Sequence, residues 1–320
     1  MKMKATNVSR AILLALAIVA VSAYAGSPRS PVAALPQGAQ AQPDFSKVEI
    51  KTTKITDSFY TLDGQGGRIG VLIGPDGILL VDSEFAPLTN KIVAALRQLS
   101  NAPIRFLVNT HVHPDHMGGN ENFGKMGVVI VARPELRERL ASGTPAVNGA
   151  GGRPPAPPAA LPLITYDGRL DFHMDGEDVE LIPIPRAHTD GDTLVRFPHA
   201  NAIMTGDFFR SVGYPNIDRT NGGSLNGMIE GLTYVTTIAG PDTKIIPGHG
   251  PIVNREAVMA HLDMILAIRD RVAQLVQQGK TEQEVVDAHP TSDYDAKVPQ
   301  AEQTSARFVG QLYAELKPAQ

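Results

Sequence analysis

Short runs of apolar residues separated by turn residues predict a β-rich start to the folded part of the chain. Residues 68–73 (RIGVLI) and 77–81 (GILLV) flank Gly74-Pro75-Asp76, which is typical of a tight turn, so they predict a β-hairpin. Residues 89–99 then carry apolar side chains at helical spacing, which predicts a helix. Residues 104–108 (IRFLV) predict the next strand.

Strand and helix patterns alternate over the rest of the chain. Further strands are predicted at 128–131, 179–184, 193–197, 202–205 and 244–246. Helices are predicted from Pro134, a position that proline tolerates, and at 224–239, 256–278, 282–288 and 301–316. Residues 143–162 are rich in Gly, Pro and Ala and predict a long mobile surface loop. Because hairpins come first, we expect an α/β (α+β) fold of mixed sheets with outer helices, not a simple doubly wound sheet.

The first 45 residues differ in composition from the rest and predict an export signal followed by a linker. Residues 1–25 combine a basic start, an apolar run and the cleavage sequence Ala23-Tyr24-Ala25, which is typical of a signal peptide. An uncleaved membrane anchor is the alternative. Residues 26–45 are rich in Pro, Ala and Gln and predict a flexible linker before a domain at 46–320. We therefore expect a periplasmic or secreted protein, with no stable membrane insertion after signal cleavage.

Charge and cysteine content narrow the classes of function. The net charge is −4 and the basic residues are scattered, so nothing indicates nucleic-acid binding, and we expect a small-molecule substrate. Cysteine is absent, which fits an oxidising compartment and a fold that needs no disulfides. Any metal ligand must therefore be a histidine or a carboxylate.

Residues 110–119 (THVHPDHMGG) hold the densest cluster of metal-binding side-chain types. Imidazole and carboxylate are the ligands that suit zinc and similar divalent ions. His111 and His113 are two residues apart, so they can point to one side of an extended backbone. Asp115 and His116 follow at once, so one short loop can serve two metal ions. Without a shared partner such a cluster would cost stability, which favours a metal site.

Three further candidate ligands each follow a predicted strand and a short turn: His188, Asp207 and His249. Functional side chains commonly gather where strands end, because a rigid sheet fixes the bases of the loops. The remaining histidines of the folded part lack this context and are interpreted as structural or surface residues: His173, His199, His261 and His289.

The series HVHPDHMGG, His188, Asp207 and His249 resembles the ordered ligand series of the metallo-β-lactamase superfamily, over about residues 46–255. Asp82, at the end of the second hairpin strand, stands where the family has an acidic residue that supports the site. The resemblance implies an αββα sandwich, in which two mixed sheets face each other, helices lie outside and metals bind at one edge.

The resemblance also implies two Zn²⁺ ions and a role for each candidate ligand. His111, His113 and His188 would hold the first ion, Asp115, His116 and His249 the second, and Asp207 would bridge both. A hydroxide between the ions would attack a carbonyl, and Asp115 would orient it and move its proton. Because carboxylate is a harder ligand than thiolate, iron or manganese could replace zinc in part.

Three positions bear on the identity of the substrate, and they favour different substrate classes. The β-lactamases usually have Cys or Ser where this chain has Asp207, whereas Asp is the pattern of glyoxalase II thioesterases and lactonases. Arg210 stands three residues later, where Cys-bearing β-lactamases commonly have a Lys that binds the substrate carboxylate, and an Arg can do this bidentately. Asn221 resembles an Asn that lies near the substrate carbonyl in those enzymes. A surface salt bridge and a turn are the alternatives for Arg210 and Asn221.

These features favour a zinc-dependent hydrolase that opens a β-lactam ring. The alternative is a hydrolase of a lactone, thioester or other ester, as in glyoxalase II. A non-catalytic metal-binding protein and an iron oxidoreductase on the same fold are further possibilities. Residues 63–67 (DGQGG) would form a mobile flap or an ordinary turn, and the helices after about residue 255 would add core packing or a dimer contact. The pattern leaves the oligomeric state open.

Overall fold

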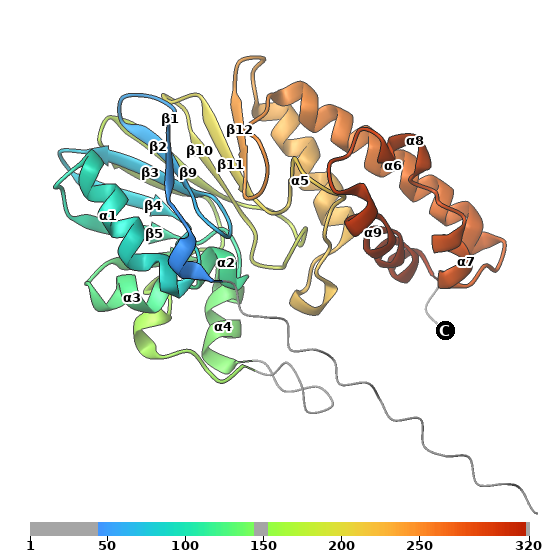
Figure 1. Cartoon of the computed structure of the whole chain (residues 1–320), viewed down its shortest axis with the longest axis horizontal. Coiled ribbons are helices and arrows are strands. Elements are labelled where there is room, and N and C mark those ends of the chain that lie inside the picture. The colour runs from blue at the N-terminus through green and yellow to red at the C-terminus, as the bar shows by residue number, and fades with distance from the viewer. Residues whose placement is uncertain (1–43, 144–152, 318–320) are drawn as a thin grey trace, which may run out of the picture. The chain divides into compact units, whose positions relative to one another are not determined.

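The computed structural model describes residues 44–143 and 153–317 (Figure 1). The chain divides into residues 1–43 and a compact unit from Asp44 to Gln320. The predicted signal peptide and almost all of the predicted linker therefore lie outside the described residues. Within the two described ranges, no helix is both long and apolar enough to cross a bilayer.

Two mixed β-sheets form the centre of the compact unit. The first has seven strands in sequence order: β1 (Lys51–Lys54), β2 (Phe59–Asp63), β3 (Ile69–Gly74), β4 (Gly77–Val81), β5 (Ile104–Val108), β6 (Val129–Ala132) and β7 (Ile164–Thr165). The second has five, in the order β12 (Lys244–Pro247), β11 (Ala202–Gly206), β10 (Thr193–Phe197), β9 (Glu177–Pro183) and β8 (Leu170–Met174). Strands β4 to β7 run parallel, as do β11 and β12, and the other neighbours are antiparallel.

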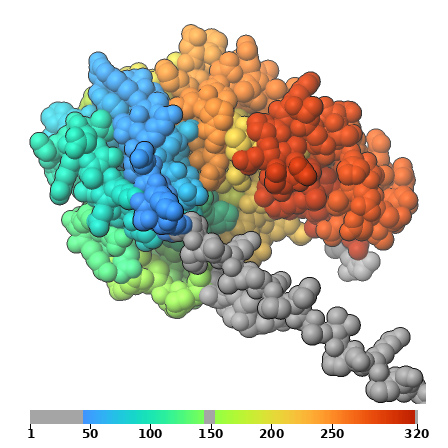
Figure 2. Space-filling model, in the orientation of Figure 1, coloured from blue at the N-terminus to red at the C-terminus, as the bar shows by residue number. Residues whose placement is uncertain are grey.

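Helices cover the outer faces of both sheets (Figure 1). The helices of the first half of the chain are α1 (Thr89–Leu99), α2 (Pro114–Met117), α3 (Asn120–Lys125) and α4 (Pro134–Ser142). Those of the second half are α5 (Leu225–Ile238), α6 (Arg255–Gln277), α7 (Glu282–Asp287), α8 (Ser292–Asp295) and α9 (Ala301–Leu316). Short 3₁₀ turns are η1 (Phe45–Lys47), η2 (Ala86–Leu88), η3 (Pro158–Ala160) and η4 (Arg219–Asn221). Figure 2 shows the C-terminal helices, orange to red, gathered on one side of the unit.

The period-two alternation of each strand divides the core into layers. In β4, Leu79 points to the layer between the sheets, whereas Leu80 points to the layer under α1. In β11, Met204 points between the sheets and Ile203 points to the layer under α5, α6 and α9. This arrangement confirms the predicted αββα sandwich of two mixed sheets with outer helices.

Most predicted elements are present, including the β3–β4 hairpin and the helices α1, α5, α6 and α9. The strands predicted from the sequence do not include β1, β2, β7 and β8. Strands β1, β7 and β8 lie at sheet edges, and β1 and β7 have mostly exposed side chains. Strand β8 does alternate apolar and polar residues, with Leu170, Phe172 and Met174 packed between the sheets. The prediction of one long mobile loop at 143–162 is wrong for its second part. Ala156 donates a backbone hydrogen bond to Leu140, and Ala160 is buried against α3. Residues 144–152 lie outside the described residues.

Candidate metal centre

The candidate ligands meet because several strands end at one edge of the two sheets. Asp82 directly follows β4, and His111 lies three residues after the parallel strand β5. In the second sheet, β9, β11 and β12 point the same way, and His188, Asp207 and His249 follow their carboxyl ends. The sheet thus brings together residues up to 167 positions apart (249 − 82).

The first group consists of His111, His113 and His188, whose candidate ligand atoms all lie within 4.8 Å of one another. His113 Nε2 hydrogen-bonds to Asp218 at 2.7 Å, and His188 Nδ1 donates to the carbonyl of Asn216 at 2.6 Å. These partners direct His113 Nδ1 and His188 Nε2 toward each other at 2.9 Å. The nitrogens that face the centre of the group are therefore defined by hydrogen bonds on the opposite side of each ring.

The second group consists of Asp115, His116 and His249. His249 Nε2 lies 3.1 Å from Asp115 Oδ2 and 3.4 Å from His116 Nε2. His116 is fully buried, and its Nδ1 hydrogen-bonds to Asp82 at 2.7 Å. The side chains of Asp115 and His249 remain 24% and 21% exposed, so the centre is open to solvent on this side.

Asp207 lies between the two groups and is only 5% exposed. Its Oδ1 is 3.4 Å from His116 Nε2, and its Oδ2 is 3.4 Å from His249 Nε2 and 4.0 Å from His188 Nε2. Gly206 enters this position in the left-handed region, at φ 52°, where a Cβ would lie 2.7 Å from the Thr110 hydroxyl. One carboxylate can therefore contact cations held by both groups.

The donor atoms of these groups fit divalent metal ions. His111 Nε2 and Asp207 Oδ1 are buried and have no hydrogen-bond partner among the described residues, and buried polar atoms are rarely left in that state. His113 Nδ1 and His188 Nε2 also face each other at 2.9 Å as two acceptors, because each ring donates from its other nitrogen. Imidazole with carboxylate is the donor set of zinc sites and also accepts iron and manganese.

The pKa values of His111 and His188 in the first group are shifted in the opposite direction from those of His116 and His249 in the second group. Burial lowers the pKa of His111 well below its usual range and that of His188 to about 4, so both rings are neutral and ready to bind a cation. Burial opposes protonation of His116 and His249 as well. The carboxylates of Asp82 and Asp207 nevertheless hold the His116 pKa well above its usual range, and Asp115 and Asp207 raise the pKa of His249 to about 9. A metal ion entering the second group must therefore displace protons.

Asp82 is a buried acceptor for three hydrogen bonds. Besides His116, it accepts from the Thr110 backbone N–H and the Thr110 hydroxyl, each at 2.7 Å. It therefore ties the loop after β5 to the end of β4 and sets which nitrogen of His116 faces the metal groups.

Glu84 is a supporting residue that the sequence analysis missed. It is 1% exposed and accepts backbone hydrogen bonds from Gly64 and Gly66, at 2.9 and 2.7 Å. Gly67 lies so close that a Cβ there would be 2.1 Å from the His116 ring. Glu84 thus holds the 63–67 loop beside His116, which favours the ordinary-turn alternative for these residues. In the sequence, the available signal for Glu84 was its position as a carboxylate two residues after Asp82.

The structure places Arg210 in the lining of a cavity and Asn221 in the 3₁₀ turn η4, which agrees with the turn alternative for Asn221. Arg210 lines a cavity of about 310 Å³ with Phe209, His261 and Lys297, and the described residues that line it include none of the seven candidate ligands. Its buried Nε has no hydrogen-bond partner within the described part of the chain. The Asn221 amide donates to Asp218 at 2.6 Å, so Asn221 supports the carboxylate that holds His113. Asp218 was missed because its partner is 105 residues away.

Curated relatives match parts of the chain. A linear primary-alkylsulfatase from Pseudomonas sp. (strain ATCC 19151) is 24% identical over 253 residues, which are 67% of this chain and 48% of that protein. A hydroxyacylglutathione hydrolase from Brucella anthropi is 29% identical over 181 residues, covering 56% of this chain and 60% of its own length. The chain thus spans about half the length of the curated relatives it matches.

Solved structures agree on the fold. The sec-alkylsulfatase Pisa1 from Pseudomonas sp. matches 85% of this chain and 52% of its own, with a TM-score of 0.61 and 15% identity. A metallo-β-lactamase from Pontibacter korlensis matches 68% of this chain and 99% of its own, with a TM-score of 0.57 and 18% identity. A sequence profile of the metallo-β-lactamase superfamily matches residues 63–249, more than half of the chain. The chain belongs to the metallo-β-lactamase superfamily.

Proposed function

We propose that this chain is a two-metal hydrolase that cleaves an ester-type bond of a small-molecule substrate. The observation that carries the proposal is the position of Asp207, a buried carboxylate within 3.4 to 4.0 Å of histidines from both metal groups. Two divalent cations at these groups would lower the pKa of a water molecule and polarise the bond to be cleaved.

Three further carboxylates have distinct roles in the proposed reaction. Asp115 is at the open side of the centre, and His249 and His116 offset the effect of burial and lower its pKa to about 2. It therefore stays ionised near neutral pH and can orient a water molecule and accept its proton through a hydrogen bond. Asp82 and Asp218 hold the rings of His116 and His113 from behind, which preserves the geometry during turnover.

An ester substrate fits the surroundings better than a β-lactam. The β-lactam prediction relies on Arg210 binding a carboxylate beside the metals and on Asn221 contacting the carbonyl. Arg210 lines a cavity whose described lining residues include none of the candidate ligands, and the Asn221 amide hydrogen-bonds with Asp218 and Arg139. Asp207 in place of Cys supports the ester proposal, because Asp is the pattern of the ester and thioester hydrolases in the resemblance.

A sulfate ester is the second candidate, and one observation favours it. The structural match to the sec-alkylsulfatase covers 85% of this chain, against 68% for the β-lactamase from Pontibacter korlensis. The longer match requires part of the C-terminal helical region, which lies outside the superfamily profile. Because this chain spans about half of that protein, the shared substrate class is a proposal.

The test is turnover by the purified, zinc-loaded chain on a carboxylic ester, an acyl lactone, a thioester, a primary alkyl sulfate, a penicillin and a carbapenem. We expect hydrolysis of an ester-type substrate that a chelator abolishes and that Asp207→Ala reduces together with metal content. Arg210→Ala should leave ester turnover unchanged. Hydrolysis of the β-lactams alone, lost in Arg210→Ala, would overturn the ester proposal.

We also propose export to the periplasm or the cell exterior, on the composition of residues 1–25. Fractionation of cells expressing the full chain, with N-terminal sequencing of the product, tests this. An intact N-terminus in the cytosolic fraction would contradict it.

A further inference from the structure

One face of α9 contacts the loop that supports the first metal group. Thr304, Gln311 and Glu315 are spaced by seven and four residues, so they lie on the same side of the helix. Gln311 Oε1 accepts a hydrogen bond from the Ile217 backbone N–H at 3.0 Å, and its Nε2 donates to Asn216 Oδ1 at 2.9 Å. Gln311 thus binds the N–H of the peptide between residues 216 and 217 and also the side chain of Asn216.

The preceding part of the loop is anchored to the same C-terminal region. The Tyr214 backbone N–H donates to Thr304 Oγ1 at 2.9 Å, and the buried Tyr214 ring stacks on Phe308 with centroids 5.8 Å apart. The Tyr214 hydroxyl donates to Asp295 at 2.7 Å, and the Gly213 N–H donates to the Pro299 carbonyl at 2.6 Å. Residues 213–217 therefore take much of their position from the α8–α9 region.

This loop ends at the two groups that orient the first metal group. The Asn216 carbonyl accepts from His188 Nδ1 at 2.6 Å, and Asp218 Oδ2 lies 2.7 Å from His113 Nε2. The Asp218 backbone N–H also donates to the His188 carbonyl at 2.9 Å. Ile217, whose N–H binds Gln311, stands between these two supports. A shift of this peptide would move the acceptor of His188 and the carboxylate behind His113 together.

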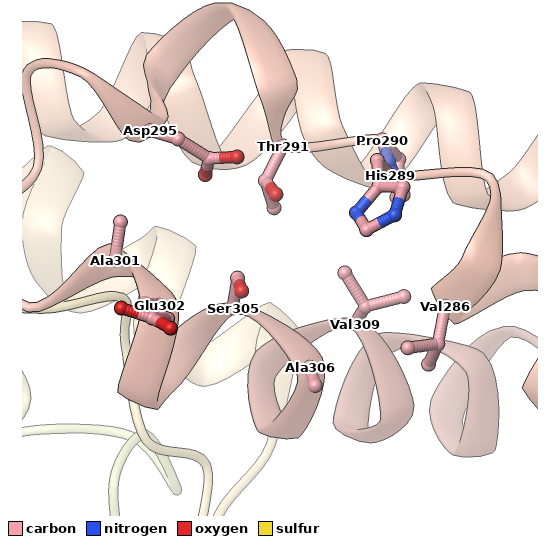
Figure 3. A pocket seen from close by; sticks show the side chains of 10 residues that line it. All are labelled: Val286, His289, Pro290, Thr291, Asp295, Ala301, Glu302, Ser305, Ala306 and Val309. Carbon is pink, nitrogen blue, oxygen red and sulfur yellow. The ribbon is translucent and has the colours of Figure 1, made fainter.

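The other side of α9 borders a cavity and offers a matched control. Figure 3 shows Ser305 and Val309 of α9 across from Thr291 and His289, around a cavity of about 480 Å³. Ser305 lies within the same turn as Thr304 but lines this cavity. Substitution of Ser305 therefore perturbs α9 without touching the hydrogen bonds to the loop.

We propose that Gln311 is a positioning residue of the metal centre, which acts through the 216–217 peptide to fix the tautomer and orientation of His188 and the placement of Asp218. The proposal rests on the proposed metal-dependent function. It assigns part of the metal centre's support to a helix outside the 63–249 region that defines the superfamily match.

The experiment measures the Zn²⁺ dissociation constant by competition with a chromophoric chelator. All variants of the full chain carry His249→Ala, so that only the three-histidine group is complete. Gln311→Met keeps the length of the side chain and removes both hydrogen bonds. It should weaken Zn²⁺ binding about tenfold, the lower end of the range for groups that support metal-binding histidines.

Two further variants separate positioning from general stability. Gln311→Glu keeps an acceptor for the Ile217 N–H, and a rotated Asn216 amide can donate to its second oxygen, so its affinity should stay within about twofold of the parent. Ser305→Ala should leave affinity unchanged. Thermal unfolding and the imidazole NMR signal of the His188 Nδ1–H, which should be lost in Gln311→Met alone, confirm folding and locate the effect.

Two results would overturn the inference and are distinguishable from each other. If neither the unaltered chain nor the His249→Ala parent binds Zn²⁺, the proposed function fails as well. If the parent binds Zn²⁺ but Gln311→Met binds it equally, or Ser305→Ala loses as much affinity as Gln311→Met, the positioning role alone fails.

Discussion

Replacement of Asp82 by Asn tests whether the second metal group depends on a buried acceptor behind His116. Asp82 is 1% exposed and sits in the left-handed region at φ 68°, which Asn also tolerates, so the backbone need not move. The substitution keeps the size of the side chain and replaces one carboxylate oxygen by an amide NH₂. It removes the charge and one acceptor while leaving the packing intact.

The magnitude follows from the hydrogen bonds of Asp82. If the Asn oxygen keeps the Thr110 N–H, its NH₂ faces the Thr110 hydroxyl and His116 Nδ1, because one carboxylate oxygen serves both. His116 must then accept at Nδ1 and carry its proton on Nε2, the atom that faces Asp207 at 3.4 Å. The loss of a correctly protonated ligand weakens metal affinity by about 10- to 100-fold, or about 1.4–2.7 kcal/mol.

The assay is the zinc content and the two stepwise dissociation constants of the purified chain. We expect Asp82→Asn to retain the ion of the three-histidine group and to lose affinity for the second ion. Asp175→Asn is the matched control, since Asp175 also has a positive φ, 55°, and accepts a backbone hydrogen bond from Asp76 at 2.8 Å on the surface. Wild-type affinity for both ions in Asp82→Asn would refute the reasoning.

Three further predictions concern pH and packing. Because the raised pKa of His249, about 9, leaves it protonated at neutral pH, metal affinity of the second group should rise with pH up to about 9. His188 has a pKa of about 4 and is already deprotonated at neutral pH, so the metal affinity of the first group should gain little from deprotonation of His188 above pH 7. Zinc titrations in competition with a chelator at pH 6, 7.5 and 9 compare the affinities of the two groups. Gly67→Ala places a Cβ 2.1 Å from the His116 ring and should lower second-ion content by at least tenfold, and full zinc occupancy would contradict this. Burial lowers the pKa of His261 to about 4, below its unfolded value near 6.5, so the free energy of unfolding falls as pH falls through this window. In urea unfolding, His261→Leu should reduce the decrease in the free energy of unfolding between pH 7 and 5 by about 1–2 kcal/mol. An unchanged decrease would refute the assignment.

The elements that the sequence predicts well are those whose signals are local. The β3–β4 hairpin requires only two β-rich runs and a three-residue turn, and α1 requires only apolar spacing within eleven residues. Ser224 was predicted to begin a helix, and its hydroxyl accepts from the Gly227 N–H at 3.1 Å. Edge strands such as β1 were not predicted, because an exposed strand has no apolar face to reveal it.

The candidate ligands could also be read from sequence, because each follows a strand and the first four lie within six residues. The residues that support these ligands and their loops could not be predicted from the sequence. Asp218 meets His113 across 105 positions, Gln311 meets Asn216 across 95, and Glu84 meets Gly64 across 20. None of these pairs leaves a spacing pattern, since each depends on where two loops arrive after the sheets pack.

The sequence by itself therefore determined the fold class, the order of the elements and the set of side chains with metal-binding chemistry, because periodicity and side-chain type are properties of neighbouring residues. Only the tertiary structure decided which nitrogen of each histidine faces the centre, how Asp207 sits between the groups, and where Arg210 and Asn221 lie. Those features depend on hydrogen bonds between segments far apart in the chain, and such contacts exist only once the two sheets and α9 have packed together.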